Sequence, residues 1–156
     1  MRKRSKYKPR PIDRDNMLLV TSGILAFSKV PEGLSLRIKN NDSLNNIRLG
    51  IGTKHDIQIL RGALNITEAL GRLGKGNDWI EEIKAGQAAL KAIANRGVRN
   101  SLRFIATGPE LTALNLAMEI HEAQLEVCTV QDVRRALALV VQEIKHKRAE
   151  PMLEST

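Results

Sequence analysis

Cysteine and histidine are scarce in this chain of 156 residues, which has one Cys and three His. The single Cys128 excludes an internal disulfide, which fits a reducing compartment such as the cytoplasm. The few thiols and imidazoles are scattered along the sequence and fall short of the ligand set of a structural zinc site. We therefore expect a cytoplasmic protein whose fold needs neither a metal nor an organic cofactor.

Aromatic residues make up 3% of the chain, and the whole set is Tyr7, Phe27, Trp79 and Phe104. Proteins that bind single-stranded nucleic acid stack the bases on aromatic side chains, so this mode of binding has little support here. Trp79 falls at the start of an apolar, periodic segment, and we expect it to point inward and anchor the core.

Long apolar runs are also missing, and none approaches the roughly 18 to 20 residues needed to cross a bilayer. The most apolar stretch, MLLVTSGILAF (residues 17–27), follows basic residues as the core of a signal peptide would. The polar SKVPEG after it offers no small-x-small cleavage site, so a helix of the folded domain is favoured over a signal peptide. We expect no interaction with a membrane.

Positive charge is abundant but unevenly placed. The net charge is +8, and residues 1–14 hold seven of the 25 Lys and Arg against one acid, a balance of +6. The remaining 18 bases and 16 acids leave only +2 for residues 15–156. Pro9 and Pro11 favour an extended backbone. We expect an extended basic arm at 1–14, one helical domain at 15–148 and a disordered tail at 149–156.

Four segments repeat apolar residues at the three- and four-residue spacing of a helix, near 54–73, 78–95, 109–127 and 130–147. Three of them open with a Thr followed three residues later by an acid, as in a capping box: Thr53/Asp56, Thr107/Glu110 and Thr129/Asp132. Gly97 stands where the second segment should end. The sequence predicts an all-α, compact bundle of four main helices plus short N-terminal helices, with the extended basic arm.

Residues 15–50 carry weaker signals. Asp15 is a candidate cap for a short helix that the VPEG turn (30–33) would end. LSLRIK (34–39) alternates apolar and polar residues, which predicts a short strand or extended connection. NDSLNNIRLG (41–50) then predicts a second short helix that ends near Gly50.

Two short motifs resemble catalytic or metal sites. GRLGKG (71–76) is glycine-rich like a phosphate loop, but it lacks the P-loop pattern and follows a helix, so the end of that helix is the favoured interpretation. Glu143 and His146 have the spacing of half a di-iron site, but the chain has no second copy. We expect a solvated pair in a last helical turn.

Two further residues are candidates for chemistry. His121 lies between Glu119 and Glu122 and has the chemistry of a general base, but a partly exposed structural histidine is the favoured interpretation. Cys128 has no neighbouring base in sequence, so we expect a small buried apolar residue. We find no convergent catalytic constellation and expect a non-enzymatic protein.

A helix-turn-helix is conceivable in LEVCTVQDVRRALAL (125–139), with Arg134 and Arg135 facing DNA. The preceding segment is acidic and would repel phosphate, which argues against this interpretation.

Basic residues form the candidate site for an acidic partner, either a protein or a nucleic acid. The arm supplies most of them, and ANRGVRNSLRF (94–104) supplies a second cluster. The predicted binding residues are Arg2, Lys3, Arg4, Lys6, Tyr7, Lys8 and Arg10 in the arm, and Arg96, Arg99 and Arg103 in the domain.

Self-association is also expected, as a dimer. Small residues that permit close approach occur in two central segments: Gly62, Ala63, Ala85, Gly86, Ala88 and Ala89. ALALVV (136–141) is apolar on more than one face, so this segment is buried either at the centre of the bundle or in a subunit contact.

RKRSKYKPRP, LSLRIKN and TGPELTALNLAMEIHEAQLE resemble a family of small basic proteins encoded by tailed bacteriophages and prophages of proteobacteria. The resemblance implies a bacterial cytoplasm as the setting and brings no catalytic residues. Small proteins of that kind bind host proteins or nucleic acid. We therefore expect an accessory protein that binds a host or phage macromolecule, or alternatively a nucleic-acid-binding protein in phage replication, recombination or regulation.

Overall fold

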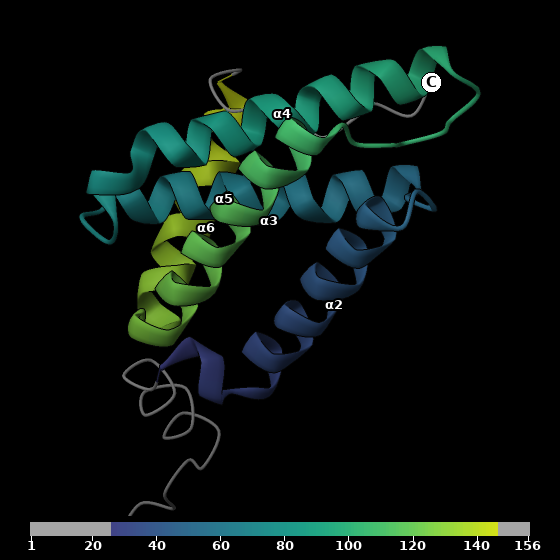
Figure 1. Cartoon of the computed structure of the whole chain (residues 1–156). Helices are drawn as coiled ribbons and strands as arrows, with labels where there is room; N and C mark the ends of the chain where they lie inside the picture. Colours follow the sequence, from purple (N-terminus) through teal and green to yellow (C-terminus); the bar gives the residue numbers. More distant parts are fainter. Residues whose placement is uncertain (1–25, 147–156) are drawn as a thin grey trace, which may run out of the picture.

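The computed structural model describes residues 26–146, which form an all-α fold (Figure 1). Its elements are η1 (Phe27–Lys29), α2 (Pro31–Arg48), α3 (Lys54–Arg72), η2 (Asn77–Trp79), α4 (Ile80–Arg99), α5 (Gly108–Val127) and α6 (Val130–Lys145). Strand pairing in this range is limited to two isolated β-bridges. The all-α expectation is confirmed, while the basic arm, the helix expected from Asp15 and the tail from residue 149 lie outside the described residues.

The four helices predicted from apolar periodicity are all present, as α3 to α6. The three predicted capping boxes form, at Thr53, Thr107 and Thr129, where each Thr hydroxyl accepts from the amide three residues on and the acid accepts from the Thr amide. These caps satisfy amides that a helix start leaves unpaired, which is why the starts were predictable to within about two residues.

A fifth long helix, α2, replaces the predicted strand. LSLRIK lies inside α2, and Pro31 of the VPEG segment is the first residue of that helix. Leu34 and Ile38 are 55% and 52% exposed, so their alternation with polar residues reflects a solvent-facing stripe and not a strand. The buried face of α2 is instead partly polar, with Asn40 and Ser43, which hid the helical period from the sequence analysis.

The core centres on α3, which packs against α2, α4, α5 and α6. α3 and α4 run side by side in opposite directions in Figure 1, with α5 crossing them. One apolar cluster lies among α3, α4 and α5 and includes Phe104; the other joins the end of α3 to α6 and includes Phe27 and Cys128. Cys128 is fully buried, as predicted.

Small residues of α4 are used inside the chain. A Cβ on Gly97 would lie 2.2 Å from Phe104 Cδ1, and one on Gly86 would lie 2.3 Å from Ala117 Cβ on α5. α4 continues past Gly97 to Arg99, so the prediction that Gly97 ends the helix was wrong. Gly86 permits close packing of α4 on α5, so it no longer argues for contact between two copies.

Trp79 was also wrongly predicted to be a core residue. It lies in η2, just before α4, and is 51% exposed. Ile83, Leu90 and Ile93 occupy the inward face of α4 instead. No helix in the described part of the chain is long and apolar enough to span a membrane.

Candidate functional site

Two loops meet at one end of the bundle. The first, residues 49–53, connects α2 to α3, and the second, residues 100–107, swings out from the end of α4 before it reaches α5 (Figure 1). An antiparallel bridge between Gly52 and Phe104 joins them. We call these two segments the paired loops. Because Phe104 is buried in the core and packs on Gly97, the bridge fixes both loops to the helical body.

The second loop has an unusual backbone. Ser101 and Leu102 have positive φ angles of 55° and 63°, and they are the only such non-glycine residues in the described range. The amide of Leu102 donates to the Gly97 carbonyl at 2.9 Å, which closes the end of α4. α2 ends with the same pattern, but there Gly50 supplies the positive φ of 74°. Positive φ is costly for a residue with a Cβ, so the α4 end is strained where the α2 end is not.

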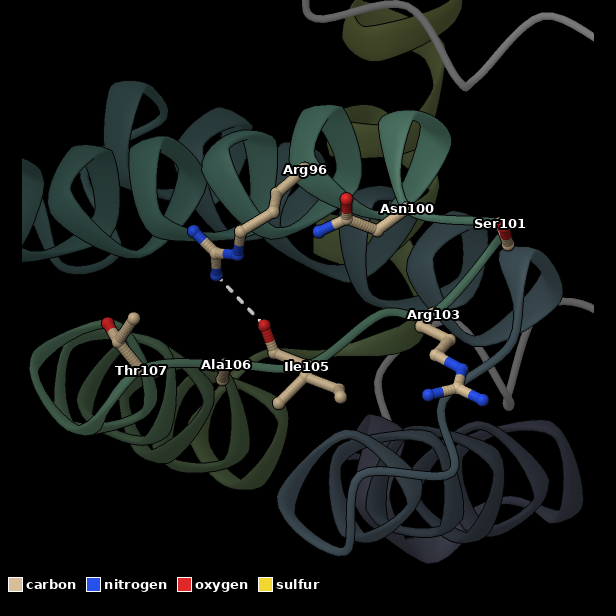
Figure 2. Close-up of a pocket in the computed structure, with 7 residues that line it drawn as sticks. All are labelled: Arg96, Asn100, Ser101, Arg103, Ile105, Ala106 and Thr107. Atoms are coloured by element: carbon tan, nitrogen blue, oxygen red, sulfur yellow. Dashed lines mark hydrogen bonds between the residues drawn. The ribbon is translucent and has the colours of Figure 1, made fainter.

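A hollow of about 570 Å³ lies between the end of α4 and the second loop. Its lining residues are Arg96, Asn100, Ser101, Arg103, Ile105, Ala106 and Thr107. Figure 2 shows the side chain of Arg96 extending from α4 to Ile105 of the loop, with Asn100 at the end of the helix and Arg103 farther along the loop. The structure therefore brings two of the three predicted arginines to one hollow, and Arg99 lies exposed in the last turn of α4.

Arg96 supports the frame of this hollow. Its guanidinium forms two hydrogen bonds to the Glu110 carboxylate, one of them 3.0 Å from Nη1 to Oε1, and donates to the Ile105 carbonyl at 2.8 Å. The hydrogen bond from Arg96 lowers the pKa of Glu110, and the same contact raises the pKa of Arg96. Because Glu110 also caps α5 through Thr107, one ion pair ties α4, the loop and α5 together.

Arg99 and Arg103 carry the uncompensated charge at this end. Both are exposed, and neither makes an ion pair or side-chain hydrogen bond with another described residue. An arginine in the last turn of a helix, such as Arg99, also stabilises the helix dipole. That explanation does not apply to Arg103, which lies beyond the helix in the loop. The predicted binding residues of the arm, from Arg2 to Arg10, lie outside the described residues.

The paired loops also expose large apolar side chains, which the sequence analysis missed. Ile51, Leu102 and Ile105 are 63%, 59% and 50% exposed, and Leu49 and Val98 are exposed nearby. Loop residues have no periodic pattern, so nothing in the sequence indicated that these side chains lie outside the core. The surface at this end therefore combines apolar side chains with two guanidinium groups that have no acidic partner in the described range.

A second hollow, of about 420 Å³, is lined by Trp79 together with residues of α5, among them Leu116, Ile120 and Val127. Its lining is mainly apolar, and exposed Trp79 forms part of its rim. No charged cluster of the kind that the sequence predicted lies in this hollow.

His121 is not the partly exposed residue that we expected. It is completely buried, its Nδ1 lies 2.7 Å from Thr67 Oγ1, and burial alone lowers its pKa to about 4. The expectation failed because His121 faces α3, where it contacts Thr67, and a local sequence pattern does not reveal such a tertiary contact. A buried, neutral His121 is out of reach of a substrate in solution.

The two short motifs have structural roles. GRLGKG ends α3 as predicted, with φ angles of 90° at Gly74 and 104° at Gly76. Glu143 is not simply solvated, because it forms an ion pair with Arg72 of α3. Within residues 26–146, no group of three or more His, Cys, Asp or Glu side chains is arranged to hold a metal ion.

No family model, curated protein or solved structure matches this chain. The evidence for function therefore comes from the chain's own residues and their arrangement.

Proposed function

We propose that this protein is a non-enzymatic accessory protein that binds an acidic macromolecule at the paired loops, with the basic arm as a second point of attachment. The observation that carries the proposal is the pair Arg99 and Arg103, two exposed guanidinium groups without an acidic partner in the described part of the chain. Guanidinium groups recognise carboxylates and phosphates by paired hydrogen bonds, and unpaired ones attract such groups over a distance.

The phage or prophage setting, and with it a bacterial cytoplasm, is part of this proposal. Its support is the resemblance of the three sequence stretches quoted above. In such a setting the partner is a host or phage macromolecule, and the protein acts by occupying or recruiting it.

A nucleic-acid-binding role in replication, recombination or regulation is the second candidate. Arg134 and Arg135 are exposed near the start of α6, where a recognition helix would present them. Against it, Glu119 and Glu126 are exposed on α5, directly before that helix. Acidic flanks of this kind repel phosphate, so the paired loops support the proposal better.

Reversing the two unpaired charges should weaken binding to an acidic polymer. We expect the double variant R99E/R103E to bind fluorescein-labelled polyglutamate at least about tenfold more weakly than the wild type at low salt, because each substitution replaces an attractive charge with a repulsive one. A tenfold loss of affinity corresponds to about 1.4 kcal/mol. The difference should shrink as salt rises, since ions screen exposed charges. Fluorescence anisotropy of the full-length chain measures both effects.

The matched control is R134E/R135E, which makes the same change in net charge on α6. If the paired loops are the site, this control should weaken binding much less than R99E/R103E does. Equal losses in the two variants would mean that only net charge matters and would overturn the proposed site. If both variants lose affinity for a DNA duplex equally, while their affinity for polyglutamate changes little, the nucleic-acid-binding role would be favoured.

We also propose that the chain forms a dimer through the outer face of α6. Leu137, Val141 and Ile144 are exposed at spacings of four and three, on a stripe beside the inward-facing Val133 and Val140. That spacing is the seam through which two helices pack, and a two-fold dimer is self-complementary there. Light scattering should give twice the chain mass for the wild type and the chain mass for L137Q/V141Q. A wild-type monomer at high micromolar concentration would remove this proposal.

A further inference from the structure

We propose that the partner is a protein, and that it docks a segment with both large apolar and acidic side chains onto the paired loops, centred on Leu102. This inference deepens the proposed function and rests on it. It names the class of partner and identifies apolar contacts that an acidic partner alone does not require.

The bridge between the loops orients two of the apolar side chains outward. In an antiparallel pair centred on Gly52 and Phe104, Ile51 lies opposite Ile105. Successive side chains in extended pairing point to opposite faces, so the burial of Phe104 in the core directs its neighbour Ile105 away from it. The exposed fractions of the two side chains agree, since Phe104 is 1% exposed and Ile105 is 50% exposed. Two isoleucines therefore stand together on the outside.

Leu102 is held in an unfavourable backbone conformation without being buried. Its φ of 63° is costly for any residue with a Cβ, and its side chain is 59% exposed. α2 ends with the matching hydrogen bond, from the Ile51 amide to the Asn46 carbonyl, so Gly50 corresponds to Ser101 and Ile51 to Leu102. Ile51 has no positive φ, and a glycine at position 102 would adopt this backbone at lower cost. Strained residues that lack a packing role in the fold are characteristic of binding surfaces. Leu102 gains its apolar contact when a partner covers it.

Charge fixes the second property of the partner. Arg99 and Arg103 lie three residues before and one residue after Leu102, and both are exposed without an acidic partner in the described range. The nearby carboxylates of Asp56 and Glu110 are already used, as helix caps. A segment that carries Asp or Glu beside its apolar side chains would pair with these guanidinium groups.

The combination favours a protein over a nucleic acid. The centres of protein interfaces are apolar, with arginine and large side chains enriched, whereas nucleic-acid interfaces are more polar and take most contacts from phosphates. A nucleic acid would contact Arg99 and Arg103 but would leave the side chains of Ile51, Leu102 and Ile105 without apolar contacts. The hollow beside Ile105, about 570 Å³ in volume, has room for side chains of the docked segment.

Two glycine substitutions separate binding from folding. L102G and S101G each remove a Cβ from a residue with positive φ, so we expect both to raise the melting temperature of the full chain by about 2–4 °C. Only L102G removes an exposed apolar side chain. We expect L102G to weaken binding by about tenfold, as at an interface hot spot, while S101G leaves it within about twofold.

The probes are peptides selected from a random displayed library on the wild-type, full-length chain. We expect the selected peptides to combine Asp or Glu with large apolar residues and to lose affinity for both L102G and R99E/R103E. Peptides that bind L102G as tightly as wild type but lose affinity for R99E/R103E would overturn this inference and leave the proposed function standing. A lower melting temperature in L102G would also overturn it, since Leu102 would then pack within the fold. Selected peptides that bind R99E/R103E and the wild type equally well would overturn the proposed function itself.

Discussion

Lowering the pH from 7 to 5 should reduce the free energy of unfolding by about 2 kcal/mol through one side chain, His121. Thr67 Oγ1 donates its single proton to the Ala63 carbonyl at 2.9 Å, so His121 Nδ1 donates to Thr67 Oγ1 at 2.7 Å. The other ring nitrogen, Nε2, is buried with no hydrogen-bond partner among the residues that the structure describes. The folded state therefore holds a neutral imidazole.

The sign of this pH dependence follows from the pKa values of His121 in the folded and unfolded states. Burial lowers its pKa in the fold from 6.5 to about 4, so between these values the unfolded chain binds a proton that the folded chain does not. The free energy of unfolding is therefore undiminished by His121 above about pH 6.5, and it decreases progressively as the pH falls toward 4. Urea denaturation at several pH values measures this slope.

Carboxylates do not obscure the effect in this pH window. Burial is the largest influence on Asp56 and raises its pKa, but hydrogen bonds led by the Thr53 amide outweigh it, and the net pKa lies below 3.8. Arg96 holds the pKa of Glu110 below 4.5. The stability that these groups contribute is lost only at lower pH.

Variants of the three histidines provide the control. In H121L the free energy of unfolding should no longer fall between pH 7 and pH 5. In H55Q and H146Q, which change exposed positions, it should fall as in the wild type. A wild-type slope that survives in H121L would show that His121 is not the group responsible.

G97A should destabilise the fold by about 2 kcal/mol, within the range for overpacked cores. The added Cβ would lie 2.2 Å from Cδ1 and 2.5 Å from Cε1 of Phe104, which is 1% exposed and has no open space into which to move. Phe104 also pairs with Gly52, so its displacement should disturb the paired loops and weaken partner binding as well. Urea denaturation gives the first effect and fluorescence anisotropy the second.

G71A is the matched control, because it is also a buried helical glycine. Its added Cβ would meet nothing closer than 3.6 Å, so the better helix propensity of Ala should leave stability unchanged or raise it by about 0.5 kcal/mol. If G97A proves as stable as G71A, Phe104 does not pack closely on Gly97 of α4.

The helices that the sequence predicted are those with strong local signals. α3, α5 and α6 each have a capping box and an apolar stripe, and both signals come from residues within one or two turns. α2 has neither, because Val30 provides no side-chain cap and the buried face includes Asn40 and Ser43. Its helical state depends on packing against α3 and α5, and such tertiary contacts leave little trace in a local pattern.

The candidate site was predictable in its charge but not in its shape. The cluster of Arg96, Arg99 and Arg103 is visible in the sequence, but the sequence does not show that Glu110 pairs with Arg96. Nor does it show that Arg99 and Arg103 have no acidic partner within residues 26–146. The apolar part of the site depends on the bridge between Gly52 and Phe104, a contact between loops more than fifty residues apart. Hydrophobic periodicity carries no information on such a pairing.

An NMR titration tests the central claim most directly. Polyglutamate is added to full-length, ¹⁵N-labelled protein, and the shifts of the backbone amides and of the single Trp79 indole are followed. Binding at the paired loops predicts that the largest shifts within residues 26–146 fall in 49–53 and 99–107, while the Trp79 indole and the amides around Arg134 and Arg135 stay nearly unchanged. Shifts that concentrate on α6 or at Trp79, with the paired loops unaffected, would contradict the account.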